Sequence, residues 1–200
     1  MSPKIVTIFV LLTAAVHSAM AQIDFTPQVT QYTAERFTHS HVTFKNDQGS
    51  VTFDPPDNWA ITGDKARVRL SPPAGNFAEA TIQTASLSAP GPFDDGTIRA
   101  LEQQALQEVP PGSQSVQVVN RIENPIVMSA DGSFGFLISY QAMGYNFQRS
   151  VVFVNRPDQR LVFRFTAPKA DFEKFLTAFH RSLGSWQWKE SMPAATVVKN

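Results

Sequence analysis

Several stretches of the chain alternate between apolar and polar residues, which is the pattern of a β-strand. The alternation is clearest over residues 134–142, 147–153 and 161–166, and short turn-forming segments separate these runs. Alternation places every second side chain on the same face, so the runs predict three consecutive antiparallel strands. Weaker signals predict further strands over residues 41–44, 51–53, 67–70, 80–87 and 116–122.

Two other stretches repeat apolar residues every three or four positions, as one face of a helix does. The first runs from about Thr97 to Pro110, and Asp94 or Asp95 can cap its N-terminus. The second runs from about Asp171 to Leu183 and carries the apolar series Phe172, Phe175, Leu176, Phe179 and Leu183. Such a face predicts a helix that lies flat on the sheet, with Gly184 as its left-handed cap.

Together these elements predict an α+β fold, an antiparallel β-sheet with helices, in one domain over residues 41–188. Residues 22–40 are rich in Thr and Gln with little periodicity, so we expect a poorly ordered lead-in. We expect residues 189–200 to form a flexible tail. The chain has no Cys, and 16 of its aromatic residues are Phe, so the fold must rest on an apolar core without disulfides.

The first 21 residues have the features of a secretory signal peptide. Lys4 precedes an apolar run over residues 5–16, and Ala19-Met20-Ala21 matches a cleavage site. As a helix the run would reach about 18 Å, short of a hydrocarbon core of about 30 Å, which disfavours the alternative of an uncleaved anchor. We therefore expect cleavage after Ala21, a periplasmic or secreted protein, and no membrane span after cleavage.

The balance of charged residues limits the kinds of partner that the protein can bind. The chain has 17 Lys or Arg and 17 Asp or Glu residues, a formal net charge of zero. A nucleic-acid-binding protein normally carries a basic patch and a basic balance, so we expect no nucleic-acid partner.

The order of several segments resembles one family. These segments are Pro55-Pro56-Asp57-Asn58-Trp59, a Phe-rich meander ending in LVFRFTAP at residues 161–168, and a last helix that ends in Arg181-Ser182-Leu183-Gly184-Ser185-Trp186. They are similar to the PsbP-like and Mog-like group, whose fold is an α/β/α sandwich, a curved antiparallel β-sheet flanked by helices. The resemblance implies that fold and a mostly non-enzymatic, accessory role, and it assigns no binding residue.

Two sets of side chains are candidates for binding. Arg67, Arg69, Arg149 and Arg164 lie at alternating strand positions, so they can converge on one sheet face and meet an anionic ligand; otherwise they pair with acids. His39 and His41 share a face if extended and can reach one metal ion, although such a site needs further ligands.

The chain has no recognisable catalytic motif. Gly132-Ser133-Phe134-Gly135 does not match the nucleophile elbow of hydrolases, and the scattered glycines match no phosphate-binding loop. We expect no cofactor and no enzymatic activity. The sequence predicts an exported binding or accessory module of the bacterial cell envelope that recognises a protein partner or a small ligand. The alternative is an envelope enzyme of hydrolase type whose site forms only in the fold.

Overall fold

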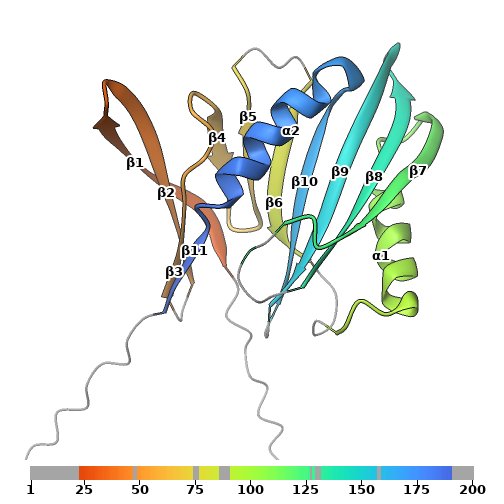
Figure 1. The fold of residues 1–200 in the computed structure, drawn as a ribbon, viewed down its shortest axis with the longest axis horizontal. Coiled ribbons are helices and arrows are strands. Elements are labelled where there is room, and N and C mark those ends of the chain that lie inside the picture. Colours follow the sequence, from red (N-terminus) through yellow and green to blue (C-terminus); the bar gives the residue numbers. More distant parts are fainter. Residues whose placement is uncertain are drawn as a thin grey trace, which may run out of the picture.

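A computed structural model describes residues 23–46, 49–73, 77–85, 91–126, 128, 132–156 and 159–190. The expected signal peptide and residues 191–200 of the expected tail lie outside the described residues. The described chain forms two antiparallel sheets and two helices, which confirms the predicted fold class (Figure 1).

The larger sheet has seven strands in the order β4-β5-β6-β10-β9-β8-β7. The predicted meander forms its centre, because β8, β9 and β10 pair in sequence. The strands are β4 (Ala60–Gly63), β5 (Arg67–Ser71), β6 (Glu79–Thr84), β7 (Gln114–Glu123), β8 (Ser133–Ala142), β9 (Tyr145–Asn155) and β10 (Arg160–Pro168).

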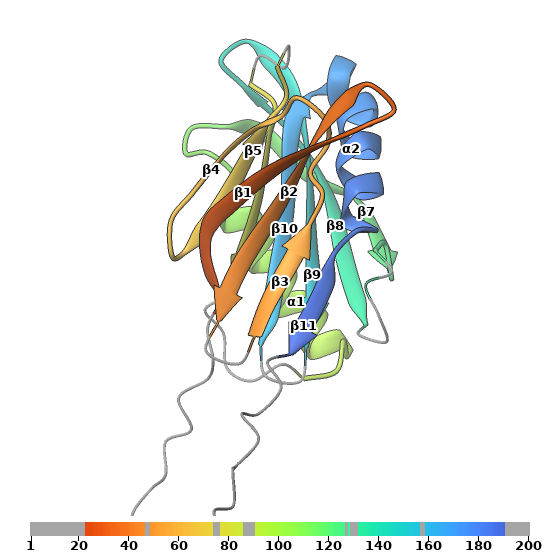
Figure 2. The ribbon, with the colours of Figure 1, turned by 90° about the vertical axis from the view of Figure 1, so that its left-hand side faces the viewer.

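The smaller sheet has four strands in the order β1-β2-β3-β11. Its strands are β1 (Asp24–Ala34), β2 (Phe37–Asn46), β3 (Gly49–Phe53) and β11 (Gln187–Glu190). The strands predicted at residues 41–44 and 51–53 lie in β2 and β3, which pair with each other. In Figure 2 the four strands lie side by side in front of the larger sheet.

The expectation of a poorly ordered lead-in at residues 22–40 was wrong. Residues 24–34 form β1 and residues 37–40 begin β2, and the two strands pair from Asp24 with Lys45 to Ala34 with Phe37. From Gln28 to Ala34 every residue of β1 is exposed, so no buried face imposes an alternating pattern on this part of the sequence. Two residues of the expected tail are also ordered, since Lys189 pairs with Ser50 in β11.

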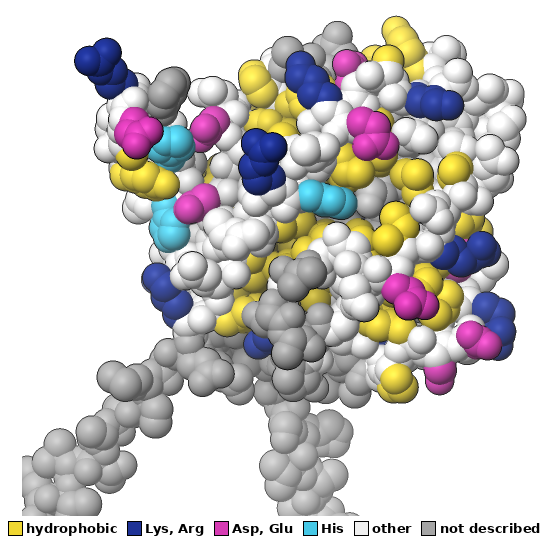
Figure 3. Space-filling model, viewed as in Figure 1, with side chains coloured by type: hydrophobic (Ala, Val, Ile, Leu, Met, Phe, Trp, Pro, Cys, Tyr) yellow, Lys and Arg dark blue, Asp and Glu magenta, His cyan; other side chains and the backbone are white. Residues whose placement is uncertain are grey.

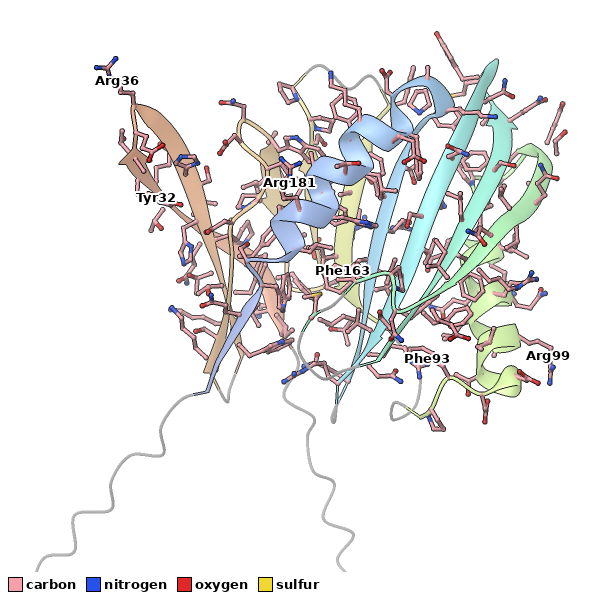
Figure 4. All side chains as sticks on the ribbon, viewed as in Figure 1. Tyr32, Arg36, Phe93, Arg99, Phe163 and Arg181 are labelled. Carbon is pink, nitrogen blue, oxygen red and sulfur yellow. The ribbon has the colours of Figure 1, made fainter. Side chains whose placement is uncertain are left out.

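The helix α2 (Lys169–Leu183) packs on one face of the larger sheet and buries Phe172, Phe175, Phe179 and Leu183. Phe179 contacts Phe165 of β10, and its ring stacks on Trp59 at 6.5 Å between centroids. Figure 4 shows Phe163 of the same strand pointing into this interior. Burying these four side chains contributes on the order of 10 kcal/mol before the loss of conformational entropy.

The predicted left-handed cap at Gly184 was wrong, because its φ is −63°. The last carbonyls are satisfied by the backbone N–H groups of residues 184–186. The Ser185 hydroxyl also donates to Ser182 O at 2.6 Å, and it accepts a hydrogen bond from Asp54 N at 2.7 Å. Ser185 thus both caps α2 and ties it to the end of β3.

The helix α1 (Asp95–Gln107) packs on the opposite face of the larger sheet. The Asp94 side chain accepts from Thr97 N at 2.7 Å, as the capping pattern predicts. Leu101 and Ala105 are buried against Phe136 and other residues of β8 and β9, whereas Figure 4 shows Arg99 pointing away from the sheet. The larger sheet is therefore covered on both faces, which makes three layers. No helix in the described part of the chain has the length and apolarity needed to cross a bilayer.

Candidate functional site

Two of the four candidate arginines meet at the C-terminal end of α1. In β9 Arg149 shares a face with Val151, and in β10 Arg164 shares a face with Val162; both valines pack under α1. Glu108 is the first residue after α1, and it contacts both arginines. The alternation of the two strands thus brings the guanidinium groups to the end of the helix.

Arg149 is buried, with 7% of its surface exposed. Its Nε donates to Thr166 Oγ1 at 2.9 Å, one Nη donates to the Glu108 carbonyl, and the other lies 3.5 Å from the Tyr140 hydroxyl. Burial lowers the pKa of the Arg149 guanidinium below its ordinary value, and the charge of Arg164 lowers it further, while Tyr140 and Glu108 oppose the shift. Within the described residues no carboxylate forms an ion pair with Arg149.

Arg164 is partly buried and forms an ion pair with the Glu108 carboxylate at 2.5 Å. Its Nε donates to Thr81 Oγ1 at 3.1 Å. Arg69 of β5 lies on the same sheet face and pairs with Glu79 at 2.9 Å, so three of the four candidates share this part of the sheet. The three guanidinium groups and two carboxylates of this sheet region leave a net charge of +1.

A cavity of about 350 Å³ opens at this position. Arg149, Arg164, Tyr140 and Thr166 line its polar side, and Phe147 and Met143 are on its apolar side. We call this cavity, with Glu79 at its edge, the arginine pocket. Burial raises the pKa of the Tyr140 phenol, so this group stays a neutral hydrogen-bonding partner at neutral pH.

Arg67 does not line the pocket, and Arg69 reaches it only through its ion pair with Glu79. Arg67 is exposed, and its register partner on β6 is Gln83, which does not line the pocket either. Sequence reasoning also missed Glu79, the first residue of β6, and Glu108, the residue after α1, and neither belongs to a motif. The only available signal for Glu108 was its place at the end of the predicted first helix.

His39 and His41 do share a face of β2, but each lies against a different acid. His39 Nδ1 is 2.9 Å from Asp57 Oδ1, and His41 Nδ1 is 2.6 Å from Asp54 Oδ1. Figure 3 shows histidine and acidic side chains next to each other over the smaller sheet. Among the described residues no group of three or more His, Asp or Glu side chains is arranged to hold a metal ion.

The hydrolase alternative requires a histidine that contacts a nucleophile. His180 lies on α2 beside Phe179, and burial lowers its pKa. In the part of the chain that the structure describes, no serine hydroxyl forms a hydrogen bond with any of these histidines.

Comparison with known proteins shows the fold. No family model and no curated protein matches the sequence. A solved structure of the cyanobacterial PsbP protein (CyanoP) from Synechocystis sp. PCC 6803 matches with a TM-score of 0.50 at 9% identity, covering 90% of this chain and 99% of that one.

Two further solved structures are similar over most of their length. A Pseudomonas aeruginosa protein of unknown function has a TM-score of 0.48 at 18% identity, covering 83% of this chain and 99% of that one. LpqN of Mycobacterium tuberculosis, which is involved in cell envelope biogenesis, has a TM-score of 0.47 at 13% identity, with coverage of 82% and 91%. The match to CyanoP shows that the three-layer architecture described above is a PsbP-like fold.

Proposed function

We propose that the protein is an exported, non-catalytic binding module of the bacterial cell envelope, and that it holds a small anionic ligand in the arginine pocket. The observation that carries this proposal is Arg149, a buried guanidinium that lines the cavity and has no carboxylate partner among the described residues. Taking a cation out of water costs free energy unless it is paired, and an entering anion would supply the missing partner.

The donor groups suit an anion with several oxygens. Arg149 makes one contact to a carbonyl, one to a hydroxyl and one long contact to Tyr140. A guanidinium carries more N–H donors than these contacts use, in the planar arrangement that fits carboxylate and phosphate. The pocket walls lower the local dielectric constant, which strengthens charge-assisted hydrogen bonds inside it.

Binding without turnover follows from the same residues. Arginine keeps its proton in proteins, and Tyr140 has a raised pKa, so neither group exchanges protons readily near neutral pH. Glu79 in the pocket lining and Glu108 beside it are engaged by Arg69 and Arg164. The pocket therefore offers charge and hydrogen bonds, and its described lining residues include no carboxylate or histidine free to act as a general base.

Export rests on the first 21 residues. We infer transport out of the cytoplasm, with cleavage after Ala21, from Lys4, the apolar run and Ala19-Met20-Ala21. The mature protein would then be a periplasmic or secreted module of the PsbP-like group. Mass spectrometry of the protein isolated from cells tests this directly. We expect a mature chain that begins at Gln22, and an intact N-terminus would contradict export by cleavage.

The proposed ligand class is tested by calorimetric titration with inorganic phosphate at low salt. We expect saturable binding with a Kd of about 1 mM or tighter. Arg149→Met should weaken it about tenfold or more, because a hydrogen bond to a charged group contributes about 1.5–3 kcal/mol. Arg164→Met serves as a second variant, and circular dichroism reports whether each variant folds.

The matched control is Arg121→Met. Arg121 pairs with Glu102 on α1, at 2.6 Å, but does not line the arginine pocket. An unspecific charge effect would weaken phosphate binding equally in the control and in the pocket variants. That result, or the absence of saturable binding by the wild-type protein, would overturn the proposal.

A further inference from the structure

Exposed apolar side chains gather at the mouth of the arginine pocket. Phe77, Met143 and Tyr145 are 52%, 71% and 51% exposed, and they belong to the eight exposed large hydrophobic residues found among the described residues. Phe77 and Met143 line the pocket, and the Tyr145 ring lies 5.6 Å from the Phe77 ring. We call these three residues, two aromatic and one methionine, the aromatic rim.

Two residues of the rim have positive φ values, which are uncommon for their residue types. Met143 and Gly144 join β8 to β9 with φ values of 50° and 78°. A two-residue turn with both φ values positive favours Asn or Gly, so Met at its first position is unfavourable for the turn. Phe77 has a φ of 62°, which is also uncommon for a bulky residue. Strained positions of this kind gather at ligand sites.

A continuous row of rings joins the rim to the buried charge. The Arg149 guanidinium lies 5.5 Å from the centre of the Tyr140 ring. That ring stacks on Phe147 at 5.4 Å, and Phe147 in turn contacts Phe77 at 6.3 Å and Tyr145 at 6.4 Å. The cavity is thus charged at its base and aromatic from its wall to its mouth.

From this arrangement we propose that the ligand is amphipathic: its anionic head binds Arg149 and Arg164, and its apolar or aromatic tail lies against the aromatic rim. The inference rests on the proposed anion site and adds the chemistry of the tail. A ligand without a tail would leave the rim in water, whereas a tail would remove apolar surface of both partners from water.

The test compares inorganic phosphate with phenyl phosphate and butyl phosphate, which carry the same head with a ring or a chain. We expect the two esters to bind about tenfold more tightly than inorganic phosphate, because each buries an apolar group. Phe77→Ala and Tyr145→Ser should each remove most of this gain. Because Tyr145 does not line the arginine pocket, Tyr145→Ser should leave the affinity for inorganic phosphate unchanged.

Tyr32→Ala is the matched control. Tyr32 is 47% exposed like the rim residues, but it lies on the β1–β2 hairpin, on the opposite side of the molecule from β8 and β9 (Figure 4). We expect this variant to bind all three phosphates like the wild type. Because Phe77 and Tyr145 are exposed, their replacement should leave the fold intact, and Met143→Ser gives a third, independent variant.

The outcomes separate the two proposals. Equal binding of all three phosphates would overturn the amphipathic ligand and leave the anion site standing. Tighter binding of the esters that survives all three rim substitutions, or that Tyr32→Ala also abolishes, would overturn the role of the rim. If the wild-type protein binds none of the three, the anion site fails and the inference fails with it.

Discussion

Glu108 holds a negative charge beside the groups that we propose to bind an anion. Its carboxylate accepts from Arg164, and its backbone carbonyl accepts from Arg149. In Glu108→Gln the side-chain amide oxygen can still accept from Arg164, while one negative charge leaves the pocket. The net charge of the three arginines and two glutamates then rises from +1 to +2, so we expect tighter binding of anions.

The size of the effect follows from Coulomb's law. With an effective dielectric constant of about 20 and a separation of about 8 Å, removing a repulsive unit charge gains about 2 kcal/mol. Side chains at this site are 17% and 20% exposed, and salt screens part of the interaction, which leaves about 1 kcal/mol. Phosphate should therefore bind about fivefold more tightly to Glu108→Gln.

The same substitution should weaken the fold, because the Arg164 ion pair becomes a neutral hydrogen bond. We expect the free energy of unfolding to fall by about 1 kcal/mol. Calorimetry and urea unfolding measure the two effects on one sample. Glu102→Gln is the control, since Glu102 also pairs an arginine to α1 but outside the pocket. Unchanged or weaker phosphate binding in Glu108→Gln would refute the electrostatic reasoning.

Two further predictions concern the fold. Phe179→Ala should lower the free energy of unfolding by about 3–5 kcal/mol in urea denaturation, because Phe179 is 1% exposed between Trp59 and Phe165; a loss below about 1 kcal/mol would contradict its place in the core. Burial lowers the pKa of His180, so the folded state binds its proton more weakly than the unfolded state. This contribution is fully present above a pH of about 6.5 and is lost as the pH falls toward the lowered value. Urea midpoints between pH 7.5 and pH 5 should therefore fall less in His180→Gln than in the wild type, and identical slopes would contradict the buried histidine.

The sequence predicted those elements whose burial is regular. Both helices and the central meander bury one face or two, so the spacing of Phe179 along α2 or Phe163 along β10 carried the information. The β1 strand could not be found this way, because exposed strands need no apolar alternation. The prediction for Gly184 was wrong because backbone N–H groups and the Ser185 hydroxyl satisfy the end of α2 without a left-handed residue.

The candidate site could be predicted only in part. Alternation alone placed Arg149 and Arg164 on one face of adjacent strands, and the strand order brought in Arg69. The pocket itself depends on where α1 ends relative to the sheet, which separates Val151 under the helix from Arg149 beyond it. No pattern in the sequence fixes that distance, so the cavity and Glu108 emerged only from the packing.

A crystal structure of the protein with 4-bromophenyl phosphate tests the anion site most directly, because bromine and phosphorus can be located independently. We expect the phosphate oxygens within hydrogen-bonding distance of Arg149 and Arg164, and the bromine beside Phe77 and Tyr145. A phosphate bound elsewhere on the molecule, with the arginine pocket unchanged, would contradict the proposed site.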